Sequence, residues 1–209
     1  VYATKGNKVG LQCGTTTISL LNGDNPLVDR EKDYYREYAV NDKEQITVSC
    51  TVNQDKADLG YYVYAFVVNG AKVDVVDNGN NVYQTASPIT VTEDLEITPI
   101  YYNKVIEADG NYVTIYTNAP KELQNSWGNS ISIYSWYDNN GAEMNGSYPG
   151  QLMMRDSQGR FFAKVSKYFY TNVDGKFTCD NNKKVLGITN NNYSEFQVVH
   201  TKFLTTPET

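Results

Sequence analysis

The side chains best suited to chemistry are two aromatic residues, Tyr134 and Trp136, in the segment 130–137. Ile131 and Ile133 precede them in alternation, and side chains of a β-strand alternate between its two faces. If the isoleucines face a core, both aromatic rings face solvent, roughly 6.5–7 Å apart. Neighbouring sugar rings of one chain can rest on two rings at this spacing, so the pattern indicates a platform for carbohydrate.

A third aromatic residue, Tyr148, precedes Pro149 and Gly150. Proline restricts its own backbone and that of the residue before it, so the Tyr148 ring loses little freedom on binding a ligand. One face of a pyranose carries C–H groups that stack on an aromatic ring, and its hydroxyls need hydrogen-bond partners. Each ring contributes on the order of 1 kcal/mol by analogy with aromatic pairs. Three rings together with their polar neighbours therefore predict dissociation constants of roughly millimolar to micromolar.

The elements that would position these rings are strands, because no long segment has a convincing helical period. Residues 46–52 alternate apolar and polar, as in a strand with one buried face. Residues 61–68 are apolar on both faces, which predicts a central strand. Asn69 and Gly70 follow, and this dipeptide predicts a tight hairpin into the strand 71–76 because both turn positions need positive φ.

The alternation lapses at residues 103–110 and resumes at 112, which predicts two domains, 1–104 and 105–209. The predicted fold class is all-β, with two β-sandwich domains in tandem. The asparagine runs at 181–182 and 190–192 are expected to be loops. The further strands expected are 89–92, 95–102, 112–116, 130–137, 151–154, 160–165, 176–179, 184–189 and 196–203.

Charge and length exclude two classes of partner. The 209 residues include 24 acidic and 18 basic side chains, scattered along the chain, with a formal net charge of −6. No positive stripe is available to neutralise phosphates, which excludes nucleic acid. The longest apolar stretch, 61–68, is far shorter than the roughly 20 residues of a membrane-spanning helix, so no membrane insertion is expected.

The cysteines Cys13, Cys50 and Cys179 are too few and too far apart for a disulfide framework or a zinc site with close ligand pairs. Either Cys13 and Cys50 pair across strands, or all three are small buried thiols, which is the interpretation we favour. The sequence starts without Met or a signal peptide, as expected of an internal segment of a larger secreted protein.

Four segments of the C-terminal half form a recognisable set: Val113-Thr-Ile-Tyr116, Ser132-Ile-Tyr-Ser-Trp136, Tyr148-Pro-Gly-Gln-Leu-Met-Met154 and Gly159-Arg-Phe-Phe-Ala-Lys-Val165. With them, residues 112–203 resemble the family 26 starch-binding carbohydrate-binding modules, and more loosely their family 25 relatives. The resemblance implies non-catalytic binding of starch, an α-1,4-glucan, without a cofactor. It assigns the contacts to Tyr134, Trp136 and Tyr148, although the family usually has Trp at the last position. Asn181 and Asn182 correspond loosely to a polar stretch of the family and are candidate polar contacts.

Residues 43–102 resemble bacterial immunoglobulin-like and related repeat domains of cell-surface proteins. The features that carry this are Val68-Asn69-Gly70, Ile89-Thr-Val-Thr-Glu-Asp-Leu-Glu-Ile97 and Pro99-Ile-Tyr-Tyr102. Such domains space or support a neighbour. Together the two resemblances imply an extracellular segment of a secreted or surface-attached bacterial protein, part of a multimodular surface protein or an amylolytic complex.

Other interpretations of these residues stay open. Tyr134 and Trp136 cover an interface with the first half if they are buried. Trp127 is either a ligand contact or a loop aromatic that caps the core. An alternative function is a cell-surface spacer or protein-interaction module without carbohydrate affinity.

No catalytic constellation is indicated. His200, the one histidine, lies in the apolar segment 196–203 without a Ser or Cys nucleophile nearby in sequence, and we expect it to be structural. A glycosidase needs two carboxylates across a cleft, and sequence spacing neither indicates nor excludes such a pair.

Overall fold

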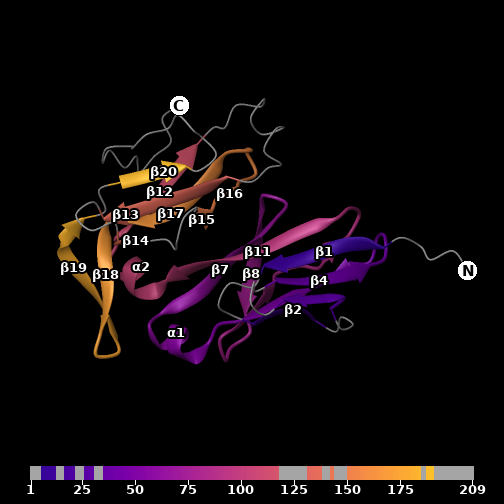
Figure 1. Ribbon diagram of the computed structural model, residues 1–209, viewed down its shortest axis with the longest axis horizontal. Helices are drawn as coiled ribbons and strands as arrows, with labels where there is room; N and C mark the ends of the chain where they lie inside the picture. Colours follow the sequence, from indigo (N-terminus) through magenta and orange to yellow (C-terminus); the bar gives the residue numbers. More distant parts are fainter. Residues whose placement is uncertain are drawn as a thin grey trace, which may run out of the picture. The chain divides into compact units, whose positions relative to one another are not determined.

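The computed structural model describes residues 6–12, 17–21, 26–30, 35–117, 131–137, 142–143, 150–184 and 187–190. Side chains are described in these ranges except at 136–137, 142–143, 180–184 and 187–190. The described part is mainly strand, with two short helices, so the predicted all-β class is confirmed (Figure 1). Backbone contacts divide the chain into two compact units, Val1–Tyr102 and Asn103–Thr209. The domain assignment 1–104 and 105–209 stays a prediction.

Strands of the first unit form one hydrogen-bonded series, β3-β4-β1-β11-β7-β8-β9-β6-β2. β1 pairs with β11 in parallel and with β4 in antiparallel orientation (Figure 1). A short separate pair joins β5 to β10. The bounds are β1 Asn7–Gln12, β2 Thr17–Leu20, β3 Val28–Arg30, β4 Tyr35–Val40, β5 Gln45–Ile46, β6 Val48–Thr51, α1 Gln54–Asp58, β7 Tyr61–Val68, β8 Ala71–Asp77, β9 Val82–Thr85, β10 Ile89–Thr90 and β11 Leu95–Asn103.

The strongest strand signals of the sequence are confirmed in this unit. β7 lies between β8 and β11, as a strand that is apolar on both faces requires. The hairpin from β7 to β8 turns at Asn69 and Gly70, with φ of 46° and 85°. The segment 46–52 is divided into β5 and β6, but its alternate residues are buried as expected: Ile46, Val48, Cys50 and Val52.

Arg36 of β4 caps one backbone group at the edge of this series. β2 pairs with β6 alone among the described strands, and Leu21 N donates to Thr47 O. Since antiparallel pairing alternates, the backbone groups of Ile18 face away from β6. Arg36 Nη1 donates to Ile18 O at 2.8 Å, and Arg36 Nε lies 3.3 Å from Asp29 Oδ2 of β3. One guanidinium therefore holds β2, β3 and β4 together.

The second unit contains three groups of paired strands: β12-β17-β16, then β13 with β14, β15 and β20, and the hairpin β18-β19. Residues from the first two groups share one core: Ile131, Ile133, Met153, Phe161, Ala163 and Val165, with Ile115 packed against them. The bounds are α2 Lys104–Ala108, β12 Tyr112–Thr117, β13 Ser132–Tyr137, β14 Ala142–Glu143, β15 Gln151–Leu152, β16 Met154–Arg155, β17 Phe161–Ser166, β18 Tyr168–Val173, β19 Lys176–Lys184 and β20 Gly187–Asn190.

The β18-β19 hairpin differs from the expectation for this region. Asp174 and Gly175, with φ of 51° and 75°, form its turn, and the two strands make the long ribbon drawn in orange in Figure 1. The expected loop at 181–182 is wrong, because both asparagines lie within β19. They fall where the register shifts between the pairs Phe169–Asp180 and Tyr168–Lys184, which leaves extra residues on β19. Asparagine is tolerated in this strand because such a bulge relaxes the regular ladder.

Candidate functional site

The central feature of the candidate site is the alternation of burial along β13. Ile131, Ile133 and Ser135 are buried, and Ser132 and Tyr134 between them are half-buried. Period-two alternation therefore places Tyr134 on the face opposite the core. The isoleucines predicted this placement of Tyr134 opposite the core; that the rings at 134 and 136 lie open to solvent stays a prediction.

β13 lies in the middle of its sheet, so strands hold its backbone on both sides of residues 134 and 136. β20 pairs Thr189 with Tyr134 and Gly187 with Trp136. β14 pairs Glu143 with Trp136 on the other side. Residues 134 and 136 therefore lie on the same face of a central strand. Gly187, which has no side chain, lies beside position 136.

Gly150 brings the chain that follows Tyr148 against the middle of β13. A Cβ atom at residue 150 would lie 2.8 Å from Tyr134 Cα and still closer to the carbonyl oxygen of Ile133. The φ of Gly150 is also 87°, in the region that favours glycine. Gly150 thus has two separate reasons to be glycine, and both serve the close approach to the residue that carries the candidate ring.

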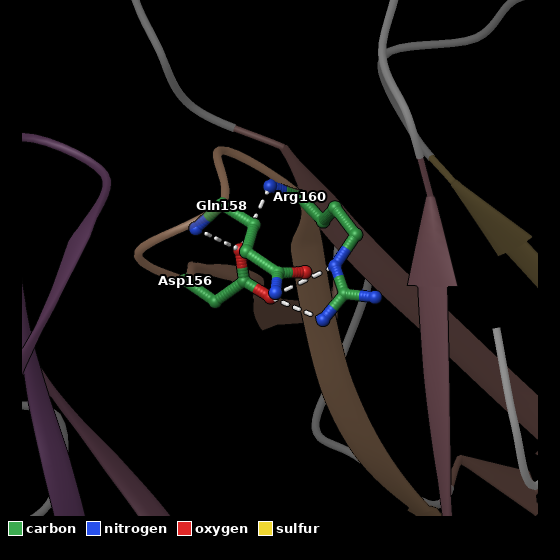
Figure 2. A network of polar contacts seen from close by, with 3 residues as sticks. All are labelled: Asp156, Gln158 and Arg160. Carbon is green, nitrogen blue, oxygen red and sulfur yellow. Dashed lines mark hydrogen bonds and ion pairs between the residues drawn. The ribbon is translucent and has the colours of Figure 1, made fainter.

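Strand β17, which packs against the core face of β13, begins at a turn that is held by one carboxylate (Figure 2). Asp156 Oδ1 accepts hydrogen bonds from Gln158 N at 2.9 Å and from Arg160 N at 3.0 Å. Asp156 Oδ2 accepts from Arg160 Nε at 3.0 Å and Nη2 at 2.8 Å. The turn fixes the start of β17, whose Phe161, Ala163 and Val165 enter the core under β13.

The same network sets the charge of this turn. Burial acts to raise the pKa of Asp156, but the hydrogen bonds from Arg160 and Gln158 outweigh it, so the pKa is lowered. The Arg160 guanidinium carbon lies 4.6 Å from the centre of the Tyr116 ring, and that ring is 5.9 Å from Phe162. Arg160 therefore ties the turn to β12 through an ion pair on one side and a cation–π contact on the other.

Of the predicted site residues, the structure describes the side chain of Tyr134 alone. Trp136 is placed by its backbone in β13. Asn181 and Asn182 lie on β19, which pairs with β18 rather than with β13 among the described pairings. Trp127 and Tyr148 lie outside the described residues, as does His200. The ligand-binding role of these residues stays a prediction.

A pair of carboxylates in the first unit is bridged by a phenol. Tyr35 Oη lies 3.2 Å from Glu37 Oε2 and 3.3 Å from Glu96 Oε1, and Lys8 Nζ lies 3.5 Å from Glu37 Oε2. These groups meet over Gly10, which the register places between Glu37 and Glu96. Burial and the Glu96 and Glu37 carboxylates raise the pKa of Tyr35 to about 12. The phenol therefore stays protonated at neutral pH and acts as a donor to one carboxylate at a time.

In the described ranges, no group of three or more His, Cys, Asp or Glu side chains is arranged to hold a metal ion. The helices in the described part lack the length and apolar character needed to cross a bilayer.

Two of the three cysteines are described. Cys50 is buried and is not in a disulfide, and its sulfur lies 3.6 Å from the Tyr101 hydroxyl. Cys179 is a free, half-buried thiol 3.8 Å from Asn111 Nδ2. Cys13 lies outside the described residues.

Several features of the site were not visible in the sequence. The Pro149-Gly150 pair signals a turn, but the contact of Gly150 with β13 is tertiary. The spacing of Asp156, Gly159 and Arg160 signals only a polar turn. Comparisons of the chain with protein-family models, curated proteins and solved structures give no match.

Proposed function

We propose that the chain is a non-catalytic module that binds starch or related α-1,4-glucans along the outer face of β13. In this proposal the first unit is an immunoglobulin-like β-sandwich that supports the second, a sandwich of family 26 type. The whole is a segment of a secreted or surface-attached bacterial protein, either a multimodular surface protein or part of an amylolytic complex.

One observation carries the proposal: Tyr134 lies on the non-core face of a central strand whose other face is buried at residues 131, 133 and 135. A ring on that face is held by a rigid element, and rigid positioning limits the entropy lost on binding. The register adds residue 136 to the same face, and Gly150 brings the segment after Tyr148 to the same strand. These placements support a platform to which three aromatic residues contribute.

Calorimetric titration with maltoheptaose tests the proposal. We expect a dissociation constant of roughly millimolar to micromolar for the unchanged chain. Tyr134→Ala removes the stacking of one ring together with its buried area, and should weaken binding about tenfold or more. Tyr134→Phe keeps the ring and should retain most of the affinity.

Tyr168→Ala is the matched control, because Tyr168 is also half-buried but lies on β18, outside the sheet of β13. It should bind maltoheptaose as the unchanged chain does. Thermal melting of each variant checks that it is folded. Absence of binding by the unchanged chain, or equal loss in Tyr134→Ala and Tyr168→Ala, would refute the platform.

The same samples distinguish the alternative functions. A spacer or protein-interaction module would show no retardation in native gels that contain amylopectin and would retain a protein partner instead. A glycoside hydrolase would release reducing sugar from starch.

A further inference from the structure

Of the three Asn-Gly dipeptides of the first unit, the two at Asn69 and Asn78 lie in described hairpin turns, and they differ in what holds the asparagine side chain. Asn69 Oδ1 accepts a hydrogen bond from Glu96 N at 2.8 Å. Asn69 Nδ2 donates to Asp94 O at 3.0 Å. Both ends of this carboxamide are therefore fixed to backbone groups at the start of β11.

Asn78 and Gly79 start the turn between β8 and β9 without such a restraint. The side chain of Asn78 is exposed, and its backbone N donates to Val82 O at 2.9 Å. A Cβ atom at Gly79 would have no neighbour within 4 Å, so the space around this residue is open. Gly79 N donates to Asp77 Oδ1 at 2.9 Å, so a carboxylate lies next to the amide proton of Gly79.

We propose that Asn78 is a site of covalent modification by ring closure with Gly79, and that Asn69 is protected from the same reaction. Gly79 N attacks Cγ of Asn78, and its proton passes to a base, for which Asp77 Oδ1 is placed. The side-chain nitrogen leaves as ammonia and a succinimide forms. Water then adds to either carbonyl of the ring and opens it to aspartate or isoaspartate. One water is consumed, one ammonia is released, and nothing is oxidised or reduced.

The structure explains both halves of this proposal. Glycine after the asparagine leaves the attacking nitrogen unhindered, because it has no Cβ. Closure at Asn69 requires its carboxamide to turn toward Gly70, which breaks both hydrogen bonds to Glu96 and Asp94. Two bonds of ordinary strength slow the reaction by about thirtyfold. In the described structure, closure at Asn78 breaks no hydrogen bond of the Asn78 carboxamide, and the bond from Gly79 N to Asp77 Oδ1 lies along the path of the departing proton.

The modification changes an exposed hairpin of the first unit. Each event replaces a neutral carboxamide with a carboxylate, next to Asp77, and makes the net charge of −6 one unit more negative. The isoaspartate product also lengthens the backbone within the turn that joins β8 to β9. The change lies in the first unit, so it does not depend on the proposed platform on β13.

Peptide mass spectrometry of the full chain, kept folded at mildly alkaline pH, tests the proposal. The peptide with Asn78 should become heavier, by the difference between a hydroxyl and an amino group, about thirtyfold faster than the peptide with Asn69. In concentrated urea the two sites should react at similar rates, because both are Asn-Gly without a folded environment. Equal rates in the folded chain would overturn the proposal. So would an unmodified Asn78 in the folded chain over a time in which the unfolded chain reacts.

Discussion

Replacing Gly150 by Ala should destabilise the second unit more than the same change at its other described glycines with positive φ. These are Gly110, Gly159 and Gly175. The φ of 87° costs an L-residue roughly 1–2 kcal/mol. The added Cβ would also meet the backbone of Ile133 and Tyr134, 2.8 Å from Tyr134 Cα, and a strand backbone cannot move aside as a side chain does. Overpacking of this kind costs about 1–3 kcal/mol. The sum predicts a loss of about 2–5 kcal/mol in the free energy of unfolding.

Gly159→Ala is the matched control for this prediction. Gly159 has a φ of 80°, but no atom lies within 4 Å of the position of its Cβ. It should lose only the conformational part, roughly 1–2 kcal/mol. Both tryptophans of the chain, Trp127 and Trp136, belong to the second unit, so urea unfolding followed by tryptophan fluorescence reports on it. Equal losses in the two variants would show that Gly150 does not pack against β13.

Two further predictions concern single side chains. Ser135 Oγ is buried with no hydrogen-bond partner in the described structure, so Ser135→Ala should raise the free energy of unfolding by about 1 kcal/mol in the same urea experiment; a similar decrease would show that the hydroxyl has a partner. The pKa of Tyr35 is about 12 in the folded chain against an ordinary 10.0, so the unfolded chain loses this proton first as the pH rises. The stability that the protonated phenol contributes is therefore fully present below pH 10.0 and is lost as the pH rises toward about 12. Tyr35→Phe should therefore show a smaller fall of the melting temperature over this range, followed by circular dichroism, and equal falls in both chains would contradict the assignment.

The sequence predicts the elements whose signals are local and strong. β7 is recognisable because it is apolar on both faces, and its hairpin because Asn69 and Gly70 both adopt positive φ without strain. β13 is recognisable because Ile131 and Ile133 alternate with polar and aromatic residues. In each case one period or one dipeptide determines the local structure, so no knowledge of distant contacts is needed.

The elements that were missed depend on contacts between distant segments. β18 has only Tyr170 buried, and that residue is fixed by Asp109 and Asn111, which are about sixty positions away in the chain. Its hairpin partner β19 runs on to Lys184, where pairing with Tyr168 resumes after the register shift at Asn181 and Asn182. Tertiary contacts of this kind leave no periodic signal in either strand.

The bond from Arg36 to Ile18 O also bears on how copies of this chain behave in concentrated solution. An exposed strand edge offers unpaired backbone groups to any other extended chain. At β2 one of these groups is already occupied by a charged side chain that a neighbouring backbone would have to displace. Losing Arg36 would leave the Ile18 carbonyl without this donor and remove a positive charge beside it, so we expect this edge to pair more readily with another chain.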